Sequence, residues 1–155
     1  MSQRTTPPFR ADHVGSLLRP AALKEARAKR ENNEITAEQL KDIEDREIAR
    51  TIRKQEEIGL KSITDGEFRR AFWHFDFLGG LGGVELFESD AGIQFKGVQT
   101  KATGVRVVNK LHYTPHVMVD HFKYLKSVTR QTPKMTIPSP SMLHYRGGRK
   151  MINMG

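Results

Sequence analysis

Residues 59–67 are Gly59-Leu60-Lys61-Ser62-Ile63-Thr64-Asp65-Gly66-Glu67, and they place a predicted strand directly behind a predicted helix. The helix is expected at about 36–58, where Thr36 is a good N-cap and Gln39 follows at the capping-box spacing. Gly59 suits a helix C-cap, and we predict the strand at 60–64. A single glycine between a helix and a strand is a tight connection that is typical of parallel α/β proteins.

The same elements are expected on both sides of this stretch. We predict a first strand at 9–14, followed by a helix at 20–30 that begins with a proline. A later helix at 114–129 leads into a third strand at 134–137. The sequence therefore predicts an α/β fold that contains three βα units.

Small and polar residues follow each predicted strand. The three strand ends are His13-Val14-Gly15-Ser16, Asp65-Gly66-Glu67 and Pro138-Ser139-Pro140-Ser141. In parallel α/β proteins the carboxyl ends of the strands form the edge at which ligands bind. This pattern favours a small-molecule site.

Two of these ends carry candidate binding residues. Gly15 allows a close backbone approach, and Ser16 offers a hydroxyl and an amide N–H to an anionic group such as a carboxylate. The alternative for this pair is an ordinary turn. Glu67 could accept from a substrate ammonium, with Asp65 orienting the turn. The alternative is an Asx turn with ion pairs to the arginines at 69–70.

The middle of the chain contains an inserted β-hairpin in our prediction, with strands at 93–100 and 104–111. The glycine-rich stretch 79–83 lacks the Walker Gly-Lys-Ser/Thr ending, so we interpret it as a flexible hinge. The aromatic cluster at 72–77 is interpreted as a packed hydrophobic loop, and the alternative is a wall for a flat ligand.

The histidines do not predict a metal site. His112 and His116 lie four residues apart, but a proline separates them, so they are not expected to share one helical face. His116 and His121 are five residues apart, which also places them on different faces. His74 and Asp76 have a spacing that is only weakly indicative of metal binding.

Composition excludes several classes of protein. The 155 residues include no cysteine, which excludes disulfides and a cysteine nucleophile within this sequence. No stretch of about 18 apolar residues is present, and the N-terminal residues lack the apolar core of a secretory signal. We therefore expect a cytoplasmic protein with no membrane partner.

The net charge of +8 is concentrated in residues 101–155, which carry ten basic side chains and one acidic side chain, Asp120. A basic segment of this kind could bind nucleic acid or another anion, and the Arg-Gly-Gly-Arg sequence at 146–149 is similar to some RNA-binding tails. Most aromatic residues lie elsewhere and no nucleic-acid motif is present, so we do not favour this alternative.

Several segments together resemble the catalytic domain of cobalamin-independent methionine synthase, and in particular its short bacterial relatives. The segments are Phe9-Arg10-Ala11-Asp12-His13-Val14-Gly15-Ser16-Leu17-Leu18-Arg19-Pro20, Gln55-Glu56-Glu57-Ile58-Gly59-Leu60, Thr64-Asp65-Gly66-Glu67-Phe68-Arg69-Arg70, and Lys134–Ile137 with Pro138-Ser139-Pro140-Ser141. The resemblance extends over nearly the whole chain from about residue 9.

The resemblance implies a (β/α)8 TIM barrel that transfers a methyl group from a methyltetrahydrofolate to the thiolate of homocysteine held on zinc. It implies that Gly15 and Ser16 hold the amino-acid carboxylate and that Glu67 holds the ammonium. It also places Ser139, Ser141 and Tyr145 near the substrate or folate side. The zinc ligands of the family, a His, two Cys and a Glu, come from later strands.

We accordingly expect residues 1–155 to be the N-terminal portion of one TIM-barrel domain, truncated or split after three βα units. Such a chain would supply homocysteine-binding residues but no catalytic residue and no metal ligand, and would be inactive alone. Its expected partners are homocysteine or a similar thiol amino acid, together with the missing barrel half or a second copy. A related barrel that alkylates another thiol is the remaining alternative.

Overall fold

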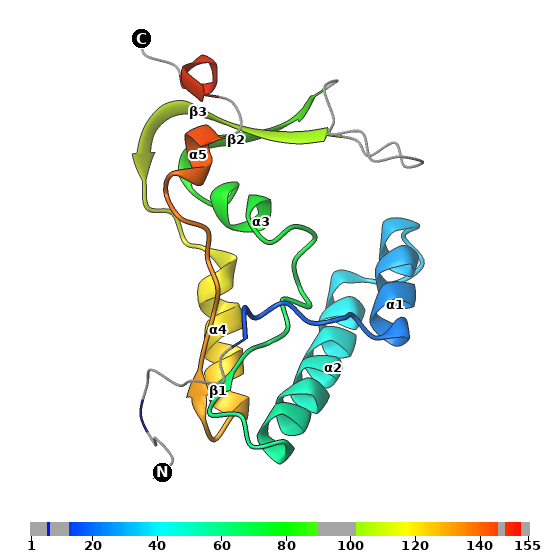
Figure 1. Cartoon of the computed structure of the whole chain (residues 1–155). Coiled ribbons are helices and arrows are strands. Elements are labelled where there is room, and N and C mark those ends of the chain that lie inside the picture. The colour runs from blue at the N-terminus through cyan, green and yellow to red at the C-terminus, as the bar shows by residue number, and fades with distance from the viewer. Residues whose placement is uncertain (1–5, 7–12, 90–101, 146–147, 153–155) are drawn as a thin grey trace, which may run out of the picture. The chain divides into compact units, whose positions relative to one another are not determined.

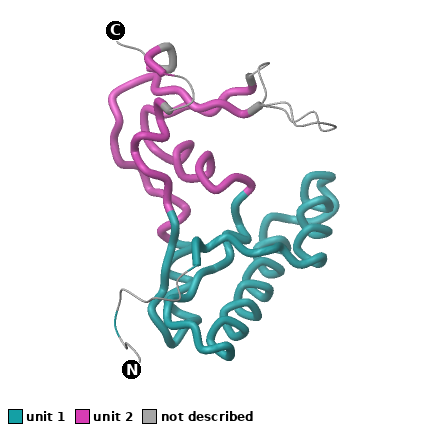
Figure 2. The backbone as a smooth tube through the Cα atoms, in the orientation of Figure 1, with its two compact units in different colours: residues 1–70, 120–136 teal, residues 71–119, 137–155 magenta. Residues whose placement is uncertain are grey.

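The structure is a computed structural model that describes residues 6, 13–89, 102–145 and 148–152 of the 155-residue chain. The chain divides into two compact units (Figure 2). Unit 1 contains residues 1–70 and 120–136, and unit 2 contains residues 71–119 and 137–155. Among the described residues, no helix is long and apolar enough to cross a membrane.

Two helices begin unit 1, as predicted. Helix α1 spans Ala21–Glu31 and packs against α2, which spans Ala37–Glu57 (Figure 1). The predicted capping box is present, because the Thr36 hydroxyl accepts from the Gln39 N–H and the Gln39 side chain accepts from the Thr36 N–H. Gly59 follows α2 with φ +87°, a left-handed conformation that a glycine adopts without a steric penalty.

The parallel strand pair of unit 1 is formed by β1 (Ser62–Ile63) and β4 (Thr132–Pro133). The second predicted strand is thus confirmed at its centre. The third lies at Thr132–Pro133, two residues before the predicted 134–137. Beyond β4, the N–H of Lys134 still donates to the Ile63 carbonyl at 2.8 Å, which extends the pairing.

The first predicted strand is not present in its described part. Residues 13 and 14 form no strand, and residues 9–12 lie outside the described residues. The described chain is therefore a mixed α/β structure with one parallel strand pair, and within those residues no barrel is formed.

Helix α4 (Val117–Val128) leads into β4, close to the predicted 114–129. It starts later than predicted because the His116 side chain accepts from the Met118 N–H at 3.1 Å and so caps the helix.

Leu125 of this helix is fully buried in the core of unit 1. That core is formed by Leu23, Ile48, Ile52, Ile63, Phe68 and Leu125. Full burial of such a side chain contributes about 1.5–3 kcal/mol, so this cluster holds α1, α2, β1 and α4 together.

Unit 2 is built on an antiparallel hairpin of β2 (Gly82–Ser89) and β3 (Ala102–His112), next to the short helices α3 (Phe75–Leu78) and α5 (Met142–Tyr145). A 3-10 turn at Gly148–Met151 follows. A hydrophobic cluster of this unit is formed by the buried side chains of Phe75, Leu78, Val105 and Leu143.

The predicted hairpin is corrected in one strand. Its second strand is β3, which contains 104–111, but the strand that pairs with it is Gly82–Ser89. The predicted strand at 93–100 lies outside the described residues. The glycine stretch is also not a simple hinge, because Gly83 lies in β2 with φ +85° beside a register shift. A Cβ at Gly83 would approach the Lys110 carbonyl oxygen to 2.6 Å, so the backbone of β3 leaves no room for a side chain at this position.

Candidate functional site

The strand ends that carry the candidate residues are joined by hydrogen bonds within unit 1. The Thr64 hydroxyl donates to the Gly15 carbonyl at 2.9 Å, and the Leu17 N–H donates to the Gly66 carbonyl at 3.1 Å. The Thr136 hydroxyl donates to the Val14 carbonyl at 2.6 Å. Residues from three distant parts of the sequence therefore meet at one place, with Ser16 exposed between two of these contacts.

Gly15 is required by the closeness of this packing. It is buried and has φ +124°, which L-residues rarely adopt. A Cβ at this position would lie 2.6 Å from the Thr136 hydroxyl oxygen and 3.4 Å from that of Thr64. The glycine therefore allows the backbone before Ser16 to contact both neighbouring threonines.

The side chain of Gln55, on α2, makes the two hydrogen bonds to the Thr64 backbone that a neighbouring strand would otherwise make. Its side-chain amide donates to the Thr64 carbonyl at 2.8 Å and accepts from the Thr64 N–H at 3.0 Å. Gln55 is 4% exposed and Thr64 is 1% exposed, so water cannot replace these bonds easily. This pair fixes the residue that immediately precedes the Asp-Gly-Glu turn.

Residues 65–68 form a tight turn with an unusual glutamate. The Phe68 N–H donates to the Asp65 carbonyl at 3.4 Å, and both central residues have positive φ, +71° at Gly66 and +57° at Glu67. Positive φ at both central positions is the signature of a type I′ turn. The Asp65 carboxylate accepts from the Glu67 N–H at 2.9 Å, which is the Asx turn of the alternative interpretation, and Asp65 thereby orients the turn. A left-handed conformation costs a non-glycine residue roughly 1–2 kcal/mol, which the surrounding contacts must offset.

The Glu67 carboxylate lies in a buried ion pair with Arg70. The Arg70 Nη1 atom is 3.5 Å from Glu67 Oε1, and the two side chains are 3% and 4% exposed, respectively. The alternative interpretation expected an ion pair between Glu67 and Arg69 or Arg70, and the structure shows the pair with Arg70. A buried carboxylate requires such a partner, since an unpaired charge in a dry site is strongly unfavourable.

Arg69 points elsewhere and connects the turn to α2. It contacts the Glu44 carboxylate at 3.0 Å and also pairs with Asp45. Its guanidinium carbon lies 5.2 Å from the ring centre of Tyr124, which donates its hydroxyl to the Asp45 carbonyl at 2.8 Å. The turn is thus attached to both α2 and α4.

Burial and this charge network shift several pKa values. Burial raises the pKa of Glu44, although the nearby guanidinium groups act in the opposite direction. Burial also acts to raise the pKa of Asp45, but the hydrogen bonds from Lys41 and Arg69 outweigh it, and the net shift is downward. Burial, followed by the charge of Arg69, lowers the pKa of His121 to about 4. At neutral pH His121 therefore adds no positive charge to this part of unit 1.

Arg19 and Arg27 bind the backbone of the turn. Arg19 donates to the Glu67 carbonyl at 3.0 Å and to the Arg70 carbonyl, while Arg27 donates to the Phe68 carbonyl and, at 3.0 Å, to the Arg70 carbonyl. These roles were not predicted from the sequence. The sequence signal was limited to basic residues before α1 and within it, which commonly indicate a solvated surface.

The second group of predicted residues lies in unit 2. The hydroxyls of Ser139 and Ser141 are 2.8 Å apart and bond to each other. The side chain of Tyr145 lies outside the described residues, although its backbone is part of α5. Gly15, Ser16 and Glu67 belong to unit 1, so the two groups are described separately.

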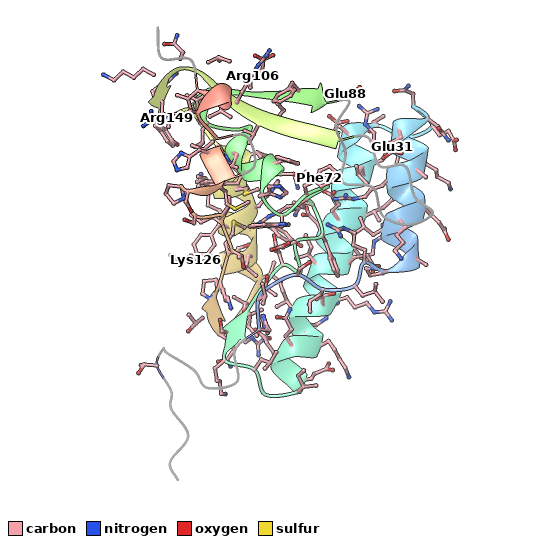
Figure 3. All side chains as sticks on the ribbon, turned by 45° about the horizontal axis from the view of Figure 1, so that its top comes forward. Glu31, Phe72, Glu88, Arg106, Lys126 and Arg149 are labelled. Carbon is pink, nitrogen blue, oxygen red and sulfur yellow. The ribbon has the colours of Figure 1, made fainter. Side chains whose placement is uncertain are left out.

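The aromatic cluster at 72–77 is partly exposed. Phe72, labelled in Figure 3, and Trp73 are 47% and 45% exposed, whereas Phe75 is buried in the core of unit 2. The Asp76 carboxylate accepts from the N–H groups of Ala71 and Phe72 at 2.9 and 2.8 Å. This carboxylate therefore organises the loop, but of these three aromatic residues only Phe75 is packed as the interpretation of a hydrophobic loop requires.

The described histidines and carboxylates do not fit a zinc site. His116 accepts from the Met118 N–H through Nδ1, and its Nε2 lies 2.9 Å from the Phe77 carbonyl, so both ring nitrogens are engaged. His112 Nδ1 lies 3.0 Å from the Lys110 carbonyl. Across the described part of the chain, no group of three or more His, Asp or Glu side chains is placed to hold a metal ion.

Some of the basic residues after position 101 are paired with carboxylates. Arg106 on β3, labelled in Figure 3, binds both oxygens of Glu85 at 2.9 and 3.1 Å. Lys123 lies 3.0 Å from Asp120. These pairs reduce the positive charge that the nucleic-acid alternative relied on.

Comparison with known proteins gives a consistent result. Residues 9–146 match the family model described as the catalytic domain of cobalamin-independent synthase. The uncharacterized protein YxjG of Bacillus subtilis is 55% identical over 146 residues, which cover 94% of this chain and 39% of YxjG. A methionine synthase of Sulfurisphaera tokodaii is 33% identical over 134 residues, which cover 82% of this chain and 37% of that protein.

Among solved structures, a candidate vitamin-B12 independent methionine synthase from Listeria monocytogenes matches with a TM-score of 0.76 and 44% identity. The match covers 96% of this chain and 41% of the Listeria chain. The chain therefore spans about two fifths of the length of the relatives it matches. On its sequence and its fold, the chain belongs to the cobalamin-independent methionine synthase catalytic-domain family.

Proposed function

We propose that this chain forms the amino-acid-binding part of a domain that methylates homocysteine or a similar thiol amino acid. In this proposal Gly15 and Ser16 bind the substrate carboxylate and Glu67 binds its ammonium group. The names of two relatives support the reaction class. One is the methionine synthase of S. tokodaii, and the other is a 5-methyltetrahydropteroyltriglutamate–homocysteine methyltransferase of Thermosynechococcus vestitus, 38% identical over 69 residues.

The observation that carries the proposal is the pair of hydrogen bonds that join the segment around Ser16 to the turn of Glu67. These bonds run from Thr64 to Gly15 and from Leu17 to Gly66. The two segments are hydrogen-bonded to each other. The Ser16 hydroxyl, which is a donor, and the Glu67 carboxylate, which is an acceptor, are therefore attached to neighbouring parts of the backbone. A zwitterionic amino acid needs this combination, a donor for its carboxylate and a negative charge for its ammonium.

The Arg70 ion pair shapes how the ammonium would bind. A carboxylate has about four acceptor positions on its two oxygens, so Glu67 can hold Arg70 and an ammonium at the same time. The Arg70 guanidinium lies beside the buried Glu67 carboxylate before any substrate arrives. The ammonium would then meet a negative charge that is already oriented by the turn.

We assign Ser139, Ser141 and Tyr145 to the folate side, with a methyltetrahydrofolate as the methyl donor. The described residues do not provide a zinc site, so we assign to them no step of the methyl transfer itself. Their role is confined to binding and orienting the amino acid.

The larger architecture is proposed on the same basis. We propose that residues 1–155 are the N-terminal portion of one (β/α)8 barrel domain, and the parallel β1–β4 pair with a helix leading into each strand supports this. The remaining part of such a domain, or a second copy of this chain, is the proposed protein partner. Light scattering of the purified chain, alone and mixed with the C-terminal part of YxjG, tests this association.

Binding of L-methionine to the 155-residue chain tests the proposed site, because methionine is a stable thioether with the same amino-acid end as homocysteine. Glu67→Gln is expected to weaken binding about tenfold or more, since a hydrogen bond between charged groups contributes about 1.5–3 kcal/mol. Ser16→Ala is expected to weaken it by a smaller factor. Isothermal titration calorimetry provides the measurement.

The controls separate the charge of Glu67 from its structural role. 4-(Methylthio)butanoate lacks the ammonium, so its weaker binding should be nearly unchanged by Glu67→Gln. Arg106→Gln removes an exposed ion pair in unit 2 and should leave methionine binding unchanged. The proposal is wrong if the wild-type chain does not bind methionine, or if Glu67→Gln weakens both ligands equally.

A further inference from the structure

The turn that carries Glu67 has an unfavourable conformation, which Asp65 within the turn and Arg19 outside it both support. Glu67 has φ +57°, and it follows Gly66, which also has positive φ. Glycine adopts this conformation readily, but a glutamate does so only when its surroundings favour it. The position of the Glu67 carboxylate therefore depends on what holds the backbone at this residue.

Arg19 is the side chain that binds the carbonyl of Glu67 itself. Its Nη2 atom lies 3.0 Å from the Glu67 carbonyl oxygen and also contacts the Arg70 carbonyl. The Arg70 N–H also donates to the Glu67 carbonyl, at 3.1 Å, which is a local bond from three residues further along the chain. Arg19 is thus a long-range donor to this carbonyl, 48 residues away in the sequence.

Arg19 also lies three residues after Ser16, on the same short segment. Between them, Leu17 donates its N–H to the Gly66 carbonyl at 3.1 Å. The Nη2 atom of Arg19 donates to both carbonyls, so this one nitrogen joins the backbone at two positions. The segment of Ser16 and the turn of Glu67 are therefore attached at Leu17 and again at Arg19.

Arg27 provides a natural comparison. It binds the same turn from α1, donating to the carbonyls of Phe68 and Arg70, but not to that of Glu67. It also lies 3.7 Å from the Glu44 carboxylate. Loss of Arg27 removes a similar number of bonds from the turn without removing the bond at Glu67.

We propose that Arg19 is a positioning residue that holds Glu67 in its left-handed conformation and so sets the preference of the site for an amino acid over the same ligand without its ammonium. This rests on the proposed function, in which Glu67 binds the ammonium. Arg19 acts through the backbone of Glu67 and does not itself contact the ligand. Its loss moves the carboxylate away from the ammonium position but leaves the carboxylate-binding segment at Ser16 in place.

The first arm of the test needs no ligand. In NMR spectra of the 155-residue chain, Glu67 is expected to give the strong intraresidue amide–Hα NOE that a positive φ produces. Arg19→Ala is expected to weaken that NOE, whereas Arg27→Ala should retain it. An unchanged NOE in folded Arg19→Ala overturns the proposal, whatever the ligand measurements show.

The second arm measures the ratio of the dissociation constants of 4-(methylthio)butanoate and L-methionine. In the wild type the ratio is expected to be about ten or more, as for other charge-paired contacts. Arg19→Ala should lower it to near one, and Arg27→Ala should leave it within about twofold of the wild type. Equal ratios in Arg19→Ala and Arg27→Ala overturn the proposal, because two arginines that only stabilise the turn would change the ratio to the same extent.

Failure of the proposed function is distinguishable from failure of this inference. A wild-type chain that binds neither ligand refutes the proposed function and, with it, any effect of Arg19 on ligand preference. If Arg19→Ala does not fold, as circular dichroism would show, Arg19→Met replaces it in both arms. Methionine keeps much of the aliphatic side chain but has no N–H to donate, so a weakened NOE and a lowered ratio support the proposal, and wild-type values overturn it.

Discussion

Replacement of Gln55 by leucine tests how the strand end before the Asp-Gly-Glu turn is held. Leucine keeps approximately the volume of glutamine but can neither donate nor accept. The substitution removes the two bonds to Thr64, at 2.8 and 3.0 Å, and a third bond to the Thr51 carbonyl at 3.2 Å. Thr64 is 1% exposed, so its N–H and C=O groups would remain buried without their partner.

The expected loss follows from these two backbone groups. Each buried polar group left unsatisfied costs about 1–3 kcal/mol, and leucine recovers part of this by burying more apolar surface. We therefore expect Gln55→Leu to lower the free energy of unfolding by about 3 kcal/mol. Single domains are stable by only about 5–15 kcal/mol, so the change is a large fraction of the total.

Urea denaturation followed by far-UV circular dichroism measures this loss. Gln39→Leu is the matched control, because Gln39 lies on the same helix and makes one exposed capping bond, whose loss should cost less than about 1 kcal/mol. Amide hydrogen exchange at Thr64 should also become faster in Gln55→Leu. A loss in Gln55→Leu no larger than in Gln39→Leu would refute the reasoning.

Three further predictions concern the same unit. Gly15→Ala should lower the free energy of unfolding, measured in urea, by about 2 kcal/mol. The reason is that φ of Gly15 is +124° and the new Cβ would lie 2.6 Å from the Thr136 hydroxyl oxygen. Wild-type stability of this variant would contradict the prediction. Because burial lowers the pKa of His121 from 6.5 to about 4, the neutral imidazole stabilises the fold fully above pH 6.5, and this contribution is lost as the pH falls towards 4. Titration of the His121 ring by NMR checks this, and a midpoint near 6.5 would show the ring to be solvated. Hydrogen bonds from Thr129 and the following backbone N–H lower the pKa of Glu56 below 4.5, so its contribution is present above that pH and lost in acid. Glu56→Gln should therefore flatten the acid side of the stability profile, and an unchanged profile would count against the bond.

The helices could be predicted closely because their signals are local. The capping box at Thr36 and the glycine at 59 mark the two ends of α2, and the structure places the helix at Ala37–Glu57 between them. The strand behind that glycine was also predicted, although only Ser62–Ile63 pairs as a strand. In each case residues a few positions apart determine the backbone conformation.

The pairing of strands could not be predicted in the same way. Alternation of side chains at 93–100 suggested the partner of β3, but Gly82–Ser89 is the segment that pairs with it. The glycines of that segment favoured a hinge, yet Gly83 lies within β2, where a Cβ would come within 2.6 Å of the Lys110 carbonyl oxygen. Strand pairing depends on contacts between distant residues, which local propensity does not determine.

The sequence alone determined the family likeness, the helices with their ends, and the positions of Gly15, Ser16 and Glu67 as candidate binding residues. The tertiary structure decided the partners of Glu67, which are Arg70 at its carboxylate and Arg19 at its carbonyl. Bonds to backbone carbonyls carry no residue-type signal, because every residue has the same carbonyl group. Which carbonyl a distant arginine reaches is therefore settled only when the chain has folded.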